Sequence, residues 1–374
     1  MTVTQSIRSR PIRSLGPIGW MRKNLFSTWY NTVLTAIGLY VVIRVLIGLV
    51  SWLLNANWAP VTTSPILYVV GQYPQEELWR IGLSLWIVSL LFGLSWAVWG
   101  NLIRNVAITM AVGLLIIGII VPFDLANVTR TMLRLFIFSN IAFLLIGYGI
   151  GQTRVGKVKW VLLGWLLSLP IIIILLRGLA PVEKLPVVET TLWGGLLVNL
   201  LLAAIGITAS FPLGVMLALG RRSSLPVVKV FSTLFIEIVR GVPLVSILFM
   251  ASILLPLFLP EDFRIDRMVR ALIGITLFSA AYMAENVRGG LQAIPLGQYD
   301  AAKAIGLSGT LTTLLIVLPQ ALRLVIPAIV GQFISLFKDT TLVLIVGLIE
   351  ILGIGKSIIA GNPEWVGAQA EAWS

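Results

Sequence analysis

The stretch QYDAAKAIGLSG, residues 298–309, lies between two apolar segments near the C-terminal end of a 374-residue chain. It carries three alanines, the oppositely charged Asp300 and Lys303, and two glycines. Residues 298–305 are good helix formers, and Gly306 is the kind of residue that ends a helix. The stretch therefore predicts a short helix of about two turns between two longer apolar ones.

We expect this short helix to begin as a separate element. Pro295 and Gly297 should stop the helix before it, and Asp300 should stand in its first turn, where a carboxylate stabilises the positive helix end. Isolated helices shorter than about 12 residues are marginal in water. The predicted helix therefore needs a surface on which to dock.

The side chains of the predicted helix suit close contact with a partner. Ala301, Ala302 and Ala304 leave its surface nearly bare, so that a groove of another protein could approach the backbone. Asp300 and Lys303 offer charges that would orient this partner. The alternative is an amphipathic loop helix that rests on the membrane part of its own chain.

The composition of the chain is that of a membrane protein. Hydrophobic residues make up 58% of it and charged residues 11%, whereas a soluble domain carries about 25% charged residues. Apolar windows of about 20 residues recur without the period-two alternation of barrel strands. We expect an all-α, polytopic helical membrane protein with spans near residues 29–54, 81–100, 105–122, 134–150, 159–177, 194–219, 232–258, 269–290, 320–337 and 340–354.

The distribution of charge predicts the orientation of these spans. A net charge of +12 could indicate nucleic-acid binding, but the excess lies in short loops and at the N-terminus, so we expect no nucleic acid partner. With a cytoplasmic N-terminus, basic loop residues fall on the cytoplasmic side: Arg104, Arg154, Lys157, Lys159, Arg221, Arg222 and Lys229. The opposite loops hold acidic residues: Glu76, Glu77, Asp124, Glu183, Glu189, Glu261, Asp262 and Asp266. Five arginines lie outside against this rule: Arg130, Arg134, Arg264, Arg267 and Arg270.

The residue inventory excludes several kinds of chemistry. The chain has no cysteine and no histidine, so it offers no disulfide, thiolate nucleophile, imidazole base or usual zinc site. A membrane-embedded hydrolase would have only carboxylates, and no matched acid pair is present. Gly353–Ser357 resembles a nucleotide loop, but Glu350 stands where the phosphate-cradling loop needs glycine. We therefore expect no metal and no cofactor in this chain, and ATP bound by another subunit.

The stretch Gly178–Thr191, which contains prolines and charges, divides the apolar sequence. We predict three parts: a cytoplasmic tail over residues 1–28, an extension of five spans over residues 29–178, and a core over residues 190–374. Within the core, the predicted cytoplasmic loop covers about residues 291–319.

The loop sequence DAAKAIGLSGTLTTLLIVLP, Asp300 to Pro319, resembles the EAA loop of ABC-importer permeases. That loop reads E-A-A, three residues, Gly, and about nine residues later I-x-L-P. The spacing from Ala302 to Gly306 fits, and Asp300 replaces the usual Glu with a side chain shorter by one methylene. The resemblance implies that ATPase subunits dock here, on residues Gln298, Asp300, Ala301, Ala302, Lys303, Ala304, Gly306 and Leu307.

Three further segments resemble the polar amino-acid branch of that family. Glu237–Leu244 resembles its E-x-x-R-G-x-P-L start of the second core helix, and Ala281–Leu291 resembles A-Y-x-A-E-x-x-R-G-G-L. Lys338–Leu342 resembles K-D-T-S-L, with Thr341 for Ser. The residues with structural roles in these motifs are Arg240, Gly241, Pro243 and Pro319.

The resemblance implies a type I ABC importer permease core preceded by extra transmembrane helices, as in permeases of general L-amino-acid importers. It implies three partners in a bacterial inner membrane: ATPase subunits that bind ATP and Mg, a periplasmic amino-acid-binding protein, and a second homologous permease in a heterodimer. The family ends with another helix, which we expect to begin near Glu371–Ser374. The alternatives are a non-ABC membrane channel or scaffold, and an ABC permease for another small polar solute.

Charged residues inside the core spans need partners or water. Glu237 with Arg240, and Glu285 with Arg288, stand at i, i+3 and could pair with each other. An amino acid would need an acceptor for its ammonium and donors for its carboxylate, ideally at a broken helix, and we expect such a break at Lys338–Asp339. The predicted substrate-path residues are Glu285, Asn286, Lys338, Asp339, Thr340 and Thr341.

Overall fold

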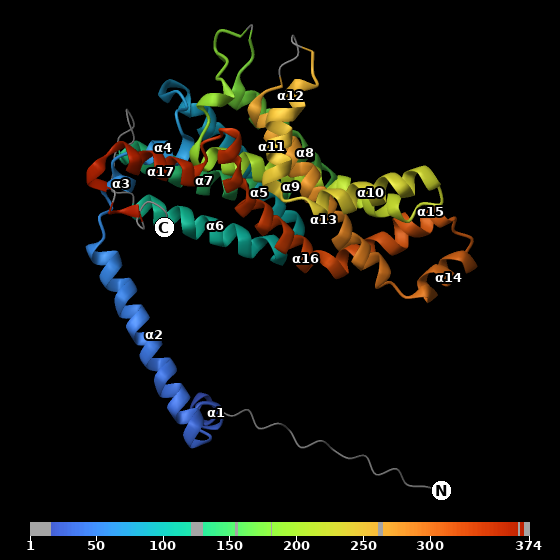
Figure 1. Cartoon of the computed structure of the whole chain (residues 1–374), viewed down its shortest axis with the longest axis horizontal. Helices are drawn as coiled ribbons and strands as arrows, with labels where there is room; N and C mark the ends of the chain where they lie inside the picture. Colours follow the sequence, from blue (N-terminus) through green and yellow to red (C-terminus); the bar gives the residue numbers. More distant parts are fainter. Residues whose placement is uncertain are drawn as a thin grey trace. The chain divides into compact units, whose positions relative to one another are not determined.

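The computed structural model describes residues 16–120, 130–153, 156–180, 182–260, 265–365 and 367–369. The chain forms two compact units, Met1–Trp58 and Ala59–Ser374. Over the described ranges both are built from helices and hold no β-strand beyond two isolated bridges (Figure 1). Several residues used above lie outside these ranges: Asp124, Arg154, Glu261, Asp262, Arg264 and Glu371–Ser374.

The first unit contains α1 (Pro17–Asn24) and the long helix α2 (Trp29–Asn55). The Thr28 side chain accepts a hydrogen bond from the backbone N–H of Asn31 and so caps α2. The apolar side chains of α2 are largely exposed within this unit, as expected for a helix surrounded by lipid. The predicted span at 29–54 is confirmed, whereas residues 17–24, predicted as part of a polar tail, form a helix.

The second unit begins with short outer segments and four long helices. These elements are α3 (Ala59–Thr62), α4 (Pro65–Val70), η1 (Gln75–Glu77), α5 (Leu78–Trp99), α6 (Asn101–Ile120), α7 (Arg130–Gly151) and α8 (Val158–Arg177). Helices α5 and α7 approach most closely at glycines, since a side chain at Gly93 or Gly147 would strike the carbonyl oxygen of Leu144 or Leu90. The Trp86 and Phe143 rings stack between them, with centroids 4.9 Å apart.

The remaining elements form the core. They are η2 (Thr190–Leu192), α9 (Gly195–Arg221), α10 (Pro226–Gly241), α11 (Leu244–Phe249), the π-helical η3 (Met250–Leu254), α12 (Leu255–Leu257), α13 (Arg267–Gln292), α14 (Leu296–Ala304), α15 (Gly309–Leu311), the π-helical η4 (Thr312–Val317), α16 (Leu318–Asp339), the 3₁₀ segment η5 (Thr340–Val346), α17 (Ile351–Gly361) and η6 (Pro363–Trp365). We name the two ends of this core after the helices that lie there. The α14 end contains α14 and the end of α9 at Arg221, and the α17 end contains α17 and the start of α9 at Gly195.

Seven helices in the described ranges are long and apolar enough to cross a membrane, or eight if α10 and α11–α12 form one bent span. Two of the predicted spans are not single straight helices. The apolar run at 232–258 is divided, with α10 and α11–α12 at 106° to each other. The run at 340–354 is η5 followed by α17, because the chain turns at Gly347, whose φ is +79°.

Two apolar clusters hold the core together, and α13 takes part in both. At the α17 end, Met268 and Ile275 of α13 pack with Leu336 of α16. At the α14 end, Met283 and Leu291 of α13 belong to the second cluster. In the most apolar stretch of α13, 56% of the residues are buried within the protein. The corresponding share is 33% or less in each of the other six spans. Helix α13 is therefore the central element of the core.

The segment that precedes α5 joins the core by a backbone hydrogen bond at the α17 end. The N–H of Gly194 donates to the carbonyl of Val70 at 3.2 Å, and the adjacent N–H of Gly195 donates to the core's own Ile349 carbonyl at 3.0 Å. The Tyr73 hydroxyl donates to the carbonyl of Leu176 at 2.8 Å, and burial raises the pKa of Tyr73 to about 12. Residues 59–177 thus share one compact unit with the core, and the functional division near 178–190 stays a prediction.

The glycine contacts between α5 and α7 yield a direct test. Gly147→Leu should destabilise the protein by about 1–3 kcal/mol, because the new side chain meets the backbone of Leu90. Gly149→Leu on the same helix is the matched control, since a Cβ there meets nothing within 4 Å. Thermal unfolding in detergent measures both, and equal unfolding temperatures for the two variants would contradict this packing.

Candidate functional site

Helix α14 confirms the short helix expected from the sequence, with shifted boundaries. It runs from Leu296 to Ala304, and the chain leaves it through Gly306, whose φ of +79° is in the left-handed region that favours glycine. Pro295 precedes the helix as predicted, but Gly297 lies inside it. Asp300 is the fifth helical residue and not a first-turn residue, because the helix begins two residues earlier than expected.

One face of α14 rests on its own core. Ala302 is 1% exposed, so it is not part of a bare outer surface as the sequence suggested. The Gln320 side chain of α16 donates to Gln298 Oε1 at 3.1 Å, and the N–H of Leu307 donates to the carbonyl of Ala302. The alternative of a loop helix resting on its own chain is therefore correct for this face.

The other face of α14 is open. Its exposed residues are Leu296, Asp300, Ala301, Lys303 and Ala304, with Ile305 directly after the helix. Leu296 is 78% exposed and Ile305 is 73% exposed, so each end of this face carries a large apolar side chain. After α14 the chain returns through α15 and η4 to α16, where Pro319 is the second residue.

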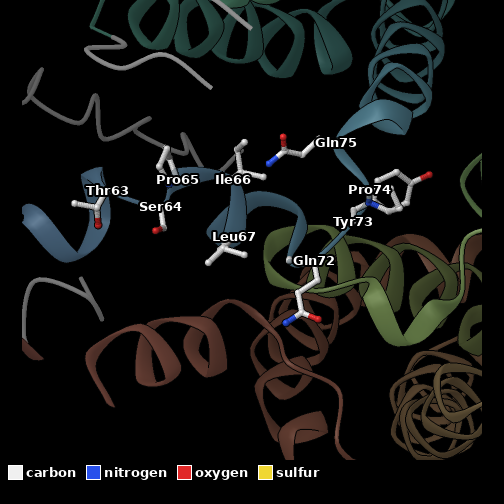
Figure 2. A pocket seen from close by; sticks show the side chains of 10 residues that line it. Thr63, Ser64, Pro65, Ile66, Leu67, Gln72, Tyr73, Pro74 and Gln75 are labelled. Carbon is white, nitrogen blue, oxygen red and sulfur yellow. The ribbon is translucent and has the colours of Figure 1, made fainter. Parts of the chain in front are cut away.

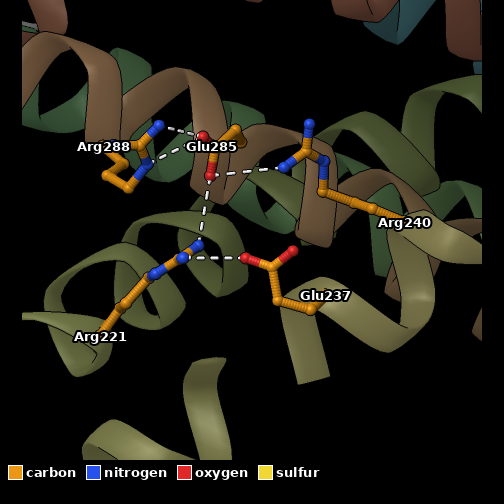
Figure 3. Close-up of polar contacts among 5 residues, drawn as sticks. All are labelled: Arg221, Glu237, Arg240, Glu285 and Arg288. Carbon is orange, nitrogen blue, oxygen red and sulfur yellow. Dashed lines mark hydrogen bonds and ion pairs between the residues drawn. The ribbon is translucent and has the colours of Figure 1, made fainter. Parts of the chain in front are cut away.

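A cluster of five charged side chains lies at the α14 end of the core (Figure 3). Glu285 of α13 is its centre: Arg288 donates to Glu285 Oε1, with Nε at 2.8 Å, and Arg221 and Arg240 approach Oε2 at 3.4 and 3.5 Å. Arg221 also binds Glu237 Oε1 at 2.8 Å. The cluster joins three helices, since Arg221 ends α9, Glu237 and Arg240 belong to α10, and Glu285 and Arg288 belong to α13.

The sequence predicted only part of this cluster. Glu285 and Arg288 form the expected i, i+3 pair, but Glu237 and Arg240 bind partners on other helices. Arg221 was expected only as a loop charge that sets orientation. Its position at the end of a span, with glutamates on the two spans that follow, is the signal that could have identified it.

The break between α10 and α11 lies where the sequence placed the structural residues Gly241 and Pro243. Gly241 is the last residue of α10 and Pro243 directly precedes α11. Arg240 reaches back from this break to Glu285, and its guanidinium lies over the Tyr282 ring at 5.4 Å. All three residues therefore shape the corner between the two helices.

The second group of predicted path residues lies at the other end of α16. Lys338 and Asp339 are the last two residues of α16, and the helix tightens into a 3₁₀ segment from Thr340 instead of breaking at Lys338. The Thr341 hydroxyl donates to the carbonyl of Lys338 at 2.9 Å, and Thr340 is fully buried. Lys338 is exposed and Asp339 is half-buried.

Two buried residues that sequence reasoning did not assign to this region hold it in place. Asn199 of α9 donates to Thr340 Oγ1 at 2.9 Å and accepts from the N–H of Ile351 at 3.1 Å. Glu350, 1% exposed, accepts from the N–H of Leu352 at 2.9 Å and of Gly353 at 2.7 Å, so it caps α17. Both satisfy backbone groups where η5 meets α17.

The structure does not bring the two groups of predicted path residues together. Glu285 and Asn286 lie near the α14 end, whereas Thr340 follows Leu336, which packs beside Ile275. Ten residues separate Ile275 from Glu285, or about 15 Å along the helix axis. The two groups are thus at different depths of the core.

Three cavities lie away from these groups. One of about 460 Å³ is lined by Thr63–Leu67 and Gly71–Gln75 (Figure 2). The second, of about 500 Å³, lies between that segment and α17, and the third, of about 720 Å³, lies between α4, α5, α6 and α7. None of the predicted path residues lines any of them. Among the described residues, no group of three or more acidic side chains could hold a metal ion.

Comparison with known proteins places this architecture in a family. Residues 210–360 match the family of binding-protein-dependent transport system inner membrane components. The inner membrane amino-acid ABC transporter permease protein YhdY of Escherichia coli is 35% identical over 373 residues, which cover 95% of this chain and 85% of that one. The glutamate/glutamine/aspartate/asparagine transport system permease protein BztC of Rhodobacter capsulatus is 36% identical, covering 98% and 90%.

The chain belongs to this family of ABC transporter permeases, and it is a multi-pass inner membrane protein. The similarity to the first two relatives extends through the helices before the core. A shorter relative, the probable glutamine ABC transporter permease protein GlnP of Bacillus subtilis, is 38% identical over 161 residues, 43% of this chain and 72% of that one.

The cap on α17 is testable by stability. Glu350→Ala should destabilise the protein by about 1–2 kcal/mol, because two backbone N–H groups lose their acceptor. Glu350→Gln should have a smaller effect, since its amide oxygen still accepts. Thermal unfolding of the two variants side by side measures this difference, and identical losses would show that capping is not the role of Glu350.

Proposed function

We propose that this chain is the transmembrane subunit of an ATP-driven importer of amino acids, and that α14 is the helix on which its ATPase subunits dock. The observation that carries the proposal is the pair of faces on α14. On one face Ala302 is buried, Tyr299 packs against the second apolar cluster and the exposed Gln298 accepts from Gln320; the opposite face is exposed with apolar residues at both ends. A helix fixed in this way transmits a push from a partner instead of absorbing it.

The charge distribution supports a cytoplasmic α14 end. Arg221, Arg222 and Lys229 lie where α9 turns into α10, at the same end as α14, and positive loop residues stay on the cytoplasmic side. This orientation puts the α17 end outside. With α6 counted as a span, six helices cross the membrane before Arg222, so that the N-terminus is inside as well. The α17 end then receives amino acids from a periplasmic binding protein.

In this proposal ATP hydrolysis belongs to the partner ATPase and this chain is no enzyme. The sequence Gly353–Ser357, which resembles a nucleotide loop, lies inside α17, and its Gly353 N–H is already bound by Glu350. It therefore offers no cradle for phosphate, and ATP and Mg bind to the ATPase subunit. The proposed docking residues are those of the predicted set other than the buried Ala302: Gln298, Asp300, Ala301, Lys303, Ala304, Gly306 and Leu307.

Closure of the ATPases on ATP would move α14, and α13 would carry this movement into the membrane. Only Ala293, Ile294 and Pro295 separate the two helices. Two permease chains rocking in this way would open the path alternately to each side. We propose a second, homologous permease as the partner, in a heterodimer.

The names of the relatives support amino acids as substrates. We propose two levels of the path: Lys338, Asp339, Thr340 and Thr341 nearer the outside, and Glu285 with Asn286 nearer the cytoplasm. An amino acid carries both an ammonium and a carboxylate. At the inner level an ammonium would compete with three guanidinium groups for Glu285, while the carboxylate would find Arg240 and Arg288 as donors.

The docking face of α14 is tested by Ala301→Arg. Ala301 is exposed, so the arginine should leave folding and membrane insertion unchanged but block close approach of the ATPase. We expect at least about a tenfold loss of the ATPase recovered with the affinity-purified chain, because a loss of about 1.4 kcal/mol of binding free energy already has this effect. Ala302 is unsuitable for this test because its side chain is buried.

Ala360→Arg is the matched control, since Ala360 is an exposed alanine on α17 at the other end of the core. It should leave ATPase recovery unchanged. If no ATPase accompanies the unsubstituted chain, the importer proposal fails and a channel or scaffold becomes the better explanation. If Ala301→Arg recovers as much ATPase as the control, docking on α14 is wrong.

The inner level of the path is tested by Glu285→Gln. If Glu285 meets the substrate, uptake of cationic amino acids should fall more than uptake of neutral or acidic ones, because the lost charge attracts only cations. Competition uptake with labelled amino acids in reconstituted vesicles gives this comparison. An equal fall for all substrates would remove Glu285 from the path and leave it a structural role.

A further inference from the structure

Helix α10 is not held in place by continuity with α11. The two helices meet at 106°, and Pro243 at their junction has no backbone N–H to extend the hydrogen-bond ladder. A Cβ at Gly241 would meet nothing within 4 Å, so the corner is also open in space. The position of α10 must therefore come from side-chain contacts along its length.

These contacts differ around α10. Ser232 and Ile236 are buried against α9 and the second apolar cluster. A second side of α10 faces the charged cluster and carries Glu237 and Arg240. The remaining face is exposed and apolar, with residues Val227, Val230, Phe231, Leu234 and Ile238. On its polar side, α10 is therefore tied to the core by charge.

Arg221 of α9 binds a glutamate on each of the other two helices. Its Nη2 binds Glu237 of α10 at 2.8 Å, and its Nη1 binds Glu285 of α13 at 3.4 Å, while its own backbone ends α9. Two donors of one planar guanidinium therefore hold two carboxylates in a fixed relation. The neighbouring Arg222 forms no ion pair with either glutamate, and it reaches α13 only through the backbone carbonyl of Leu291, at 3.3 Å.

We propose that Arg221 is a positioning residue that clamps α10 to α13, so that both helices move with α14 as one body and the Gly241–Pro243 corner acts as the hinge toward α11. This inference rests on the proposed function, because it assigns Arg221 a part in transmitting the movement of α14. Without the clamp, α13 still follows α14, and α10 keeps only its apolar contacts and the 3.5 Å contact of Arg240 with Glu285, so that it can swing at the corner.

The test compares three variants of the purified complex in vesicles, each measured for basal ATP hydrolysis and for substrate transported per ATP hydrolysed. Arg221→Glu should leave basal hydrolysis unchanged and lower transport per ATP about tenfold, within the range of coupling energies of contacting charges. Adding Glu237→Arg should restore transport per ATP to within about twofold of the unsubstituted chain, because the ion pair between positions 221 and 237 forms again with its charges exchanged. Arg222→Glu is the matched control and should transport as the unsubstituted chain does.

A distance measurement checks the clamp without relying on activity. Because the chain has no cysteine, Lys229→Cys on α10 and Gln292→Cys at the end of α13 can be spin-labelled cleanly. We expect the distance between the labels to be the same with and without ATP, and to change with ATP once Arg221→Glu is added. A distance that changes with ATP in the otherwise unsubstituted chain would overturn the proposal.

The outcomes separate this inference from the function on which it rests. If the unsubstituted complex transports no amino acid with ATP, both are wrong. If it transports and Arg221→Glu transports equally well per ATP, only the clamp is wrong. If the Arg221→Glu protein is folded and adding Glu237→Arg does not restore its transport per ATP, the clamp proposal is likewise wrong, whereas the importer function is unaffected.

Discussion

Helix α13 packs against α9 and α16 through small residues, and the positions of the other core elements follow from this packing. A Cβ at Gly214 would lie 2.5 Å from Met283 Cβ, and a Cβ at Gly290 would lie 2.6 Å from the carbonyl oxygen of Ala321. In a bilayer, helices gain little from leaving lipid, so close packing of small residues must hold them together. The same helix carries Glu285 and leads directly into α14. Helix α13 therefore connects the apolar cluster at the α17 end, the charged cluster and the short helix α14.

The long spans could be predicted from the sequence because their length and apolarity are fixed by the bilayer. Helices α2, α5, α7, α8, α9 and α13 appear where apolar windows placed them. The same windows did not predict the bend within 232–258 or the turn within 340–354, because an apolar run shows that a segment avoids water and does not show where it turns. Pro243 and Gly347 were the local signals for these turns. Helix α14 was predictable because its composition differs from that of its surroundings.

The partners of the charged residues could not be predicted in the same way. Pairs at i, i+3 can be read from spacing, and Glu285 with Arg288 is such a pair. The bonds of Arg221 to Glu237 and Glu285 depend on how α9, α10 and α13 cross, which spacing along the chain does not determine. The same holds for Asn199. In the sequence it is only a polar residue within an apolar helix, whereas in the structure its side chain hydrogen-bonds to both η5 and α17.

The central claim, that α14 is a cytoplasmic docking helix, is tested most directly by labelling. The natural absence of cysteine allows Lys303→Cys, on the exposed face of α14, to be the one target of a membrane-impermeant maleimide. The account predicts that this residue is labelled in inside-out vesicles stripped of ATPase, is not labelled in intact cells, and is protected once the ATPase subunits are added back. Labelling from outside intact cells, or labelling that is unchanged by the ATPase, would contradict it.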